Sequence, residues 1–85
     1  MDRRDAIKRF IVAEFAPDIS TADLADDYDL IDGGVVDSLG LLKVIGWLES
    51  EFGVPIDDVE LAPENFRSVT EINEFVARHV TNERV

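Results

Sequence analysis

The sequence predicts a small all-α protein, a four-helix bundle of three main helices and a short third helix, with a long first loop. Three segments repeat apolar residues at the spacing of an α-helix, and no segment alternates with period two for long enough to form a strand. The 85 residues are 46% hydrophobic and include no cysteine, so packing alone must hold one core together. We therefore expect residues 1–85 to form a single domain.

The first helix is expected over about residues 2–15, after which Pro17 stops it. Residues 16–37 lose the helical spacing and contain two glycines and seven aspartates, so they are expected to form a long loop with one short turn near Thr21–Leu24. Loops of this length in a small domain are usually functional. The apolar side chains of the loop favour its packing back onto the core: Leu24, Tyr28, Leu30, Ile31, Val35 and Val36.

The second helix is expected over Ser38–Phe52, with Gly53 as its C-terminal stop. Three of its residues, Leu39, Lys43 and Trp47, follow one another at i, i+4 and i+8 and lie off the apolar face. That broad face, which we expect to meet the core, consists of Leu41, Leu42, Val44, Ile45, Leu48 and Phe52.

Residues 54–56 are expected to be extended, and the acidic, irregular residues 57–66 have room for the short third helix, which Pro63 can start. The last helix opens at Ser68, and Glu71 follows at the spacing of a capping box. The chain after His79 is expected to fray. The apolar stripe of this helix consists of Val69, Ile72, Phe75 and Val76.

The charge balance is strongly acidic, with 19 acidic residues against eight basic ones and a net charge of −11. Such a field repels nucleic-acid phosphates and anionic lipid headgroups, so we expect neither nucleic-acid nor membrane binding. It either attracts basic patches on partner proteins or only keeps the protein soluble. Neither a signal peptide's apolar stretch nor a membrane-spanning segment is evident, so a cytoplasmic location is expected.

Catalysis by the chain itself is not expected. Asp37, Ser38 and His79 supply the residue types of a hydrolase triad, but the sequence around the serine reads VDSLG rather than G-x-S-x-G. The chain is also too short to build both a substrate pocket and a positioned triad. Ser38 stands where a loop meets a helix, and this position leaves two other roles for it: a helix N-cap or a functional serine.

A metal site is not expected either, although residues 26–33 are rich in aspartate. Placing the invariant glycine of a calcium-binding EF-hand loop on Gly33 puts Tyr28 at the first ligand position. Placing it on Gly34 puts Ile31 and Gly33 at ligand positions. A solvated acidic loop is the better interpretation.

Residues 29–39 read DLIDGGVVDSL, which resembles the signature of the acyl and peptidyl carrier proteins that ends in Asp-Ser-Leu. The resemblance extends to the end of the second helix, LESEFG, to the acidic third segment and to the last helix begun by Ser68. It implies that Ser38 carries a 4′-phosphopantetheine arm, which a phosphopantetheinyl transferase attaches from coenzyme A. It also implies that Asp37 lies beside the metal and phosphate of that transfer complex.

By the same resemblance, the thiol of the arm holds an acyl or aminoacyl intermediate as a thioester, and the chain is a carrier on which partner enzymes act. The helix after Ser38 is then the partner-binding surface, with Leu39 as a docking position beside Lys43. Trp47 is either an exposed anchor of that surface or a cover for the edge of the core. Lys43, Gly40 and Gly46 depart from fatty-acid carriers, so the usual fatty-acid synthase partners are not expected.

The stretches VVDSLG, which contains Ser38, and APENFRSV, which contains Pro63, look more like free-standing carriers of secondary metabolism. That group includes aminoacyl and prolyl carriers of nonribosomal pathways, and the D-alanyl carriers are similar. The resemblance therefore implies an adenylating or acyltransferase loading enzyme and downstream biosynthetic enzymes of a nonribosomal peptide, polyketide or related pathway. We expect a monomer. The alternative is an unmodified acidic helical adaptor that binds a basic partner protein.

Overall fold

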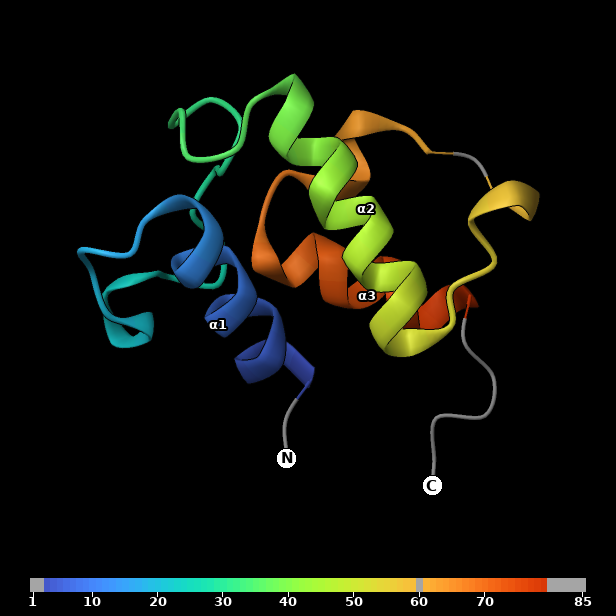
Figure 1. Cartoon of the computed structure of the whole chain (residues 1–85), viewed down its shortest axis with the longest axis horizontal. Coiled ribbons are helices and arrows are strands. Elements are labelled where there is room, and N and C mark those ends of the chain that lie inside the picture. Colours follow the sequence, from blue (N-terminus) through green and yellow to red (C-terminus); the bar gives the residue numbers. More distant parts are fainter. Residues whose placement is uncertain (1–2, 60, 80–85) are drawn as a thin grey trace.

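Three α-helices and three short 3₁₀ helices make up the computed structural model, which describes residues 3–59 and 61–79 (Figure 1). Helix α2 crosses in front of α3, and α1 lies to one side of both. The predicted all-α fold is confirmed. The elements in chain order are α1 (Arg3–Phe15), η1 (Thr21–Asp23), α2 (Ser38–Phe52), η2 (Ile56–Asp58), η3 (Pro63–Phe66) and α3 (Val69–His79).

The ends of α2 follow from its flanking residues. The carboxylate of Asp37 accepts a hydrogen bond from the Gly40 N–H at 2.7 Å and so caps the N-terminus. At the other end Gly53 adopts a left-handed conformation with φ of 73°, and its N–H donates to the carbonyl of Glu49 at 3.0 Å. Both ends lie where the sequence predicts them.

The segment between α2 and α3 differs in detail from expectation. Ile56 is not extended but begins η2, because the Asp58 N–H closes a turn onto the Pro55 carbonyl at 2.9 Å. The short third helix begins at Pro63 as predicted. It is a 3₁₀ turn rather than an α-helix, with a bond from the Asn65 N–H to the carbonyl of Ala62.

The core is formed by apolar side chains from all three α-helices and from the segments between them. The long loop packs onto it as predicted, because Leu24, Leu30 and Val36 are buried. Tyr28 is an exception at 42% exposure, and its ring lies over Gly33, where a β-carbon would collide with the tyrosine hydroxyl. The buried set is Ile7, Ile11, Leu24, Leu30, Val36, Val44, Ile45, Leu48, Val54, Phe66, Val69, Ile72, Phe75 and Val76.

The expectation that Leu42 faces the core is wrong, because its side chain is 65% exposed. The buried face of α2 is centred on Val44 and Leu48, so Leu42 lies beyond one edge of it and Trp47 lies at the other. A helical wheel shows which side is apolar, but the neighbouring elements decide how much of that side is covered.

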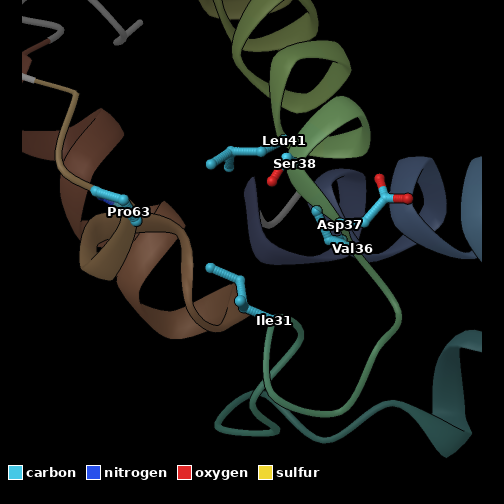
Figure 2. A pocket seen from close by; sticks show the side chains of 6 residues that line it. All are labelled: Ile31, Val36, Asp37, Ser38, Leu41 and Pro63. Carbon is cyan, nitrogen blue, oxygen red and sulfur yellow. The ribbon is translucent and has the colours of Figure 1, made fainter.

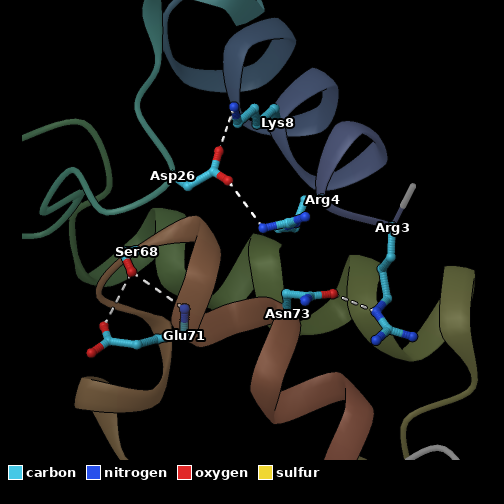
Figure 3. Close-up of polar contacts among 7 residues, drawn as sticks. All are labelled: Arg3, Arg4, Lys8, Asp26, Ser68, Glu71 and Asn73. Carbon is cyan, nitrogen blue, oxygen red and sulfur yellow. Dashed lines mark hydrogen bonds and ion pairs between the residues drawn. The ribbon is translucent and has the colours of Figure 1, made fainter. Parts of the chain in front are cut away.

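Charged and polar side chains tie the loop and the helices together (Figure 3). The Asp26 carboxylate in the loop pairs with Lys8 at 2.5 Å and with Arg4 at 3.4 Å, both on α1. At the start of α3, the Ser68 hydroxyl accepts from the Glu71 N–H at 3.3 Å and contacts the Glu71 carboxylate at 3.4 Å. The serine half of the predicted capping box is therefore formed.

In the part of the chain that the structure describes, no helix combines the length and the apolar character needed to cross a bilayer. The residues expected to fray after His79 lie outside the described residues.

Candidate functional site

Ser38 is the first residue of α2, and its side chain is exposed. The residue two positions earlier, Val36, is only 2% exposed, and its N–H donates to the carbonyl of Leu30 at 2.9 Å. The chain therefore leaves the core at Val36 and presents Ser38 to solvent directly afterwards. Ser38 is not the helix cap, since Asp37 holds that position. The fold thus has no need of the Ser38 hydroxyl for capping.

The loop before Ser38 is shaped by the Asp29 carboxylate and by two glycines. Asp29 accepts hydrogen bonds from the N–H groups of Ile31 at 3.1 Å and Asp32 at 2.8 Å. The Gly33 N–H donates to the Asp29 carbonyl at 2.9 Å, and Gly34 has a φ of 80°, which favours glycine. These local bonds turn the chain back toward α2, so that the loop delivers Ser38 in a defined place.

Gly40 allows α1 to approach the first turn of α2. A β-carbon at Gly40 would lie 2.7 Å from the ring of Phe15 and 3.2 Å from the capping oxygen of Asp37. Gly40 is therefore required by the close packing of Phe15 against the first turn of α2. Gly46 differs, because a β-carbon there would meet nothing within 4 Å.

A surface pocket of about 280 Å³ lies directly beside Ser38. Figure 2 shows that the Ser38 hydroxyl and the side chains of Ile31, Leu41 and Pro63 face the same space. The Asp37 carboxylate points away from it. The pocket is lined by Ile31, Val36, Asp37, Ser38, Leu41 and Pro63.

Two opposite walls of the pocket, Ile31 and Pro63, come from segments that are bonded to each other. The Leu30 N–H donates to the carbonyl of Arg67 at 2.7 Å, and the Arg67 guanidinium lies 3.6 Å from the Asp29 carboxylate. These contacts join the loop to the turn between η3 and α3. The sequence did not reveal the pocket or the role of Arg67, because both depend on contacts between residues 32 to 38 positions apart along the chain.

The predicted partner-binding residues do not form one open stripe. Leu39 is 75% exposed, and the exposed Lys43 lies 3.8 Å from the Glu14 carboxylate. Trp47 instead is half-buried and stacks on Phe10 of α1, with ring centroids 4.4 Å apart. The structure thus places Trp47 at the edge of the core, one of the two alternatives that the sequence left open.

The exposed Leu42 lies one turn after Leu39 on α2, so the apolar surface beside Ser38 consists of these two leucines. Sequence reasoning assigned Leu42 to the core and therefore missed it. Its position at i+3 from Leu39 was the only available signal.

The residues of a hydrolase triad are not assembled. His79, the last residue of α3, packs against Phe75 with ring centroids 4.7 Å apart and does not line the pocket beside Ser38. Within residues 3–59 and 61–79, no group of three or more His, Cys, Asp or Glu side chains is placed to hold a metal ion.

A family model described as the phosphopantetheine attachment site matches residues 9–76. The chain belongs to this family. Its members carry 4′-phosphopantetheine covalently, and they are generally non-catalytic carriers that interact with phosphopantetheinyl transferases and biosynthetic enzymes.

The curated relatives include two D-alanyl carrier proteins. That of Streptococcus suis strain 05ZYH33 is 33% identical over 72 residues, which cover 85% of this chain and 87% of that protein. That of Streptococcus pyogenes serotype M1 is 41% identical over 46 residues, which cover 54% of this chain and 58% of that protein. The expected resemblance to carrier proteins is confirmed.

Two solved structures are similar over nearly the whole chain. The structure of KstB-PCP (apo) is 54% identical, with a TM-score of 0.80, and the match covers 92% of this chain and 86% of that one. The solution structure of KstB-PCP in kosinostatin biosynthesis is also 54% identical, with a TM-score of 0.68 and coverage of 95% and 91%.

The geometry around Ser38 fits a phosphopantetheine phosphodiester. The serine oxygen is exposed, and it lies at the N-terminus of a helix of 15 residues, where backbone N–H groups and the helix dipole stabilise an anion. The adjoining pocket leaves open space for the atoms that follow the phosphate. The carrier function expected from the resemblance therefore agrees with the local structure.

Proposed function

We propose that Ser38 bears the 4′-phosphopantetheine arm and that the chain carries an acyl or aminoacyl intermediate as a thioester for a natural-product pathway. The observation that supports this assignment most directly is the exposed Ser38 hydroxyl, released from any capping role by Asp37, at the N-terminus of α2. Residues 1–85 act as one carrier domain, a monomer located where coenzyme A is available in the cytoplasm.

The attachment reaction uses the serine oxygen as a nucleophile. On the transferase, the Ser38 oxygen attacks the coenzyme A phosphorus that bears the pantetheine group and loses its proton, and the pyrophosphate bond breaks. The product is a phosphodiester that joins the serine oxygen to the pantetheine group, and the nucleotide part of coenzyme A leaves with the other phosphate. Asp37 keeps the first turn of α2 in place through the Gly40 N–H, and its exposed carboxylate is available to the metal ion of the transfer complex.

The partner surface comprises Leu39 and Leu42 next to Ser38, with Lys43 one turn after Leu39 on the exposed side of α2. Leucines at i and i+3 lie side by side on the helix, so the exposed Leu39 and Leu42 offer a partner one continuous apolar contact. The partners are the phosphopantetheinyl transferase, an adenylating or acyltransferase loading enzyme, and downstream biosynthetic enzymes. The natural-product assignment is supported by the similarity to KstB-PCP in kosinostatin biosynthesis.

The test is intact-mass spectrometry after incubation with coenzyme A and a broad-specificity phosphopantetheinyl transferase. The wild type should gain the mass of one phosphopantetheine, and Ser38→Ala should gain none. Ser50→Ala is the matched control, because Ser50 is also an exposed serine of α2, and it should be modified like the wild type.

Circular dichroism should show that all three proteins are folded. A folded wild type that gains no mass would contradict the proposal and favour an unmodified acidic adaptor. A mass gain in Ser38→Ala would place the attachment on another residue.

A further inference from the structure

The pocket beside Ser38 differs from its surroundings in chemistry. The chain carries a net charge of −11, yet Ile31, Val36, Leu41 and Pro63 supply an apolar lining. The one carboxylate of the lining, that of Asp37, turns away toward the Gly40 N–H. An apolar pocket that includes the modified serine in its wall is suited to an apolar group that begins close to that serine.

We propose that the pocket binds the branched pantoyl segment of the arm, so that the phosphopantetheine rests against the protein at its attached end. This inference rests on the proposed attachment to Ser38. The pantoyl segment, with its two methyl groups on one carbon, follows the phosphate directly and is the most apolar part of the arm. The amide groups and the thiol come later and have no comparable reason to enter an apolar pocket.

The location of the pocket limits what else can enter it. Ser38 itself is part of the lining, so the first atoms of an arm attached to it start at the edge of this space. Behind the pocket, Val36 belongs to the closed core, in which Leu30 and Leu48 are fully buried. With the pantoyl segment in the pocket, the thioester and its cargo extend outside the protein and stay accessible to partner enzymes.

Arg67 acts as a positioning residue for this pocket. Its carbonyl accepts the Leu30 N–H at 2.7 Å, and its guanidinium faces the Asp29 carboxylate at 3.6 Å. These two contacts hold the wall that carries Ile31 at a fixed place relative to the η3 wall that carries Pro63. The pocket is therefore formed before the arm is attached, which lowers the entropy cost of binding it.

The test is NMR spectroscopy of the holo protein, labelled with ¹³C and ¹⁵N and carrying an unlabelled arm. A filtered NOE experiment should show contacts from the two pantoyl methyl groups to the methyl groups of Ile31 and Leu41. Leu41→Ala should reduce the remaining contacts to Ile31 several-fold. Leu61→Ala, an exposed leucine that lines neither the pocket nor the proposed partner surface, should leave them unchanged.

The outcomes separate this inference from the proposed function. A protein that gains the phosphopantetheine mass but shows no NOE between the pantoyl methyl groups and the pocket would overturn the inference and leave the carrier function intact. Equal NOE losses in the two leucine variants would also overturn it. A protein that gains no mass would refute the attachment itself. If Leu41→Ala is unfolded, the NOEs of the wild type alone still decide.

Discussion

Replacing each of two glycines of α2 by alanine should change the stability of the protein in opposite directions. Gly40 is buried beneath Phe15, whereas Gly46 is exposed and has open space where a β-carbon would stand. The chemical change is the same on the same helix, so only the surroundings of the two positions differ.

The expected magnitudes follow from the contacts. At Gly46 the added methyl group meets nothing within 4 Å, so the variant should gain up to about 1 kcal/mol from the better helix propensity of alanine. At Gly40 the methyl group would lie 2.7 Å from the Phe15 ring, and forcing a carbon into packed space costs about 1–3 kcal/mol. It would also crowd the Asp37 oxygen that caps the helix, a contact worth about 1 kcal/mol. The gain of about 1 kcal/mol in helix propensity offsets part of these costs, so the net loss should be about 1–3 kcal/mol.

Urea denaturation followed by circular dichroism measures both free energies of unfolding. A change of 1 kcal/mol corresponds to about 4–8 °C in Tm for a domain of this size, so thermal unfolding should also separate the two variants clearly. The reasoning would be refuted by Gly40→Ala being at least as stable as the wild type. In that case α1 does not approach the first turn of α2 as closely as the structure shows.

Three further predictions concern capping, the tryptophan and salt. Asp37→Ala should lower the free energy of unfolding by about 1 kcal/mol in urea denaturation, whereas Asp37→Asn, which can still cap the helix, should preserve it. Equal stability of the wild type and both variants would contradict the cap. If both variants are phosphopantetheinylated more slowly, as measured by mass spectrometry, the carboxylate charge also acts in the transfer. Trp47→Ala should lower the free energy of unfolding by about 2–3 kcal/mol, because the stacked contact with Phe10 is lost. A variant that keeps the wild-type Tm but is not loaded by the partner enzyme would instead make Trp47 an interface residue. Raised salt should slow the loading of the arm by the partner enzyme, because a net charge of −11 steers the encounter with basic partners and salt screens that attraction. A loading rate independent of ionic strength would show that the acidic surface has no such steering role.

Local signals in the sequence were sufficient to place the α-helices and to put Ser38 at the start of α2. Helix α2 begins at Ser38 and stops at Gly53 as predicted, because a cap and a left-handed stop act within one turn of the residues they serve, although the cap is Asp37 and not Ser38. Pro63 likewise starts η3 where expected, since proline favours the first position of a helix. The sequence also predicted that the loop packs onto the core, because its apolar residues are too many to remain in solvent.

Tertiary structure decided how the residues of α2 are shared between core and surface. Leu42 and Trp47 lie on opposite sides of the buried face, and a helical wheel treats both edges alike. Phe10 of α1 supplies a stacking partner for Trp47, while Leu42 is left exposed. Which edge is covered depends on where α1 packs, and this is not encoded in the periodicity of α2 alone.

The same distinction applies to the site. The sequence by itself determined that Asp37 and Ser38 stand where a loop meets a helix, because those residues are neighbours in the chain. It was the structure that assigned the cap to Asp37 rather than to Ser38. Only the tertiary structure decided that the serine opens onto an apolar pocket between Ile31 and Pro63. Its two walls are joined by the contacts of Arg67 with Leu30 and Asp29, and such long-range contacts form only when the chain has folded.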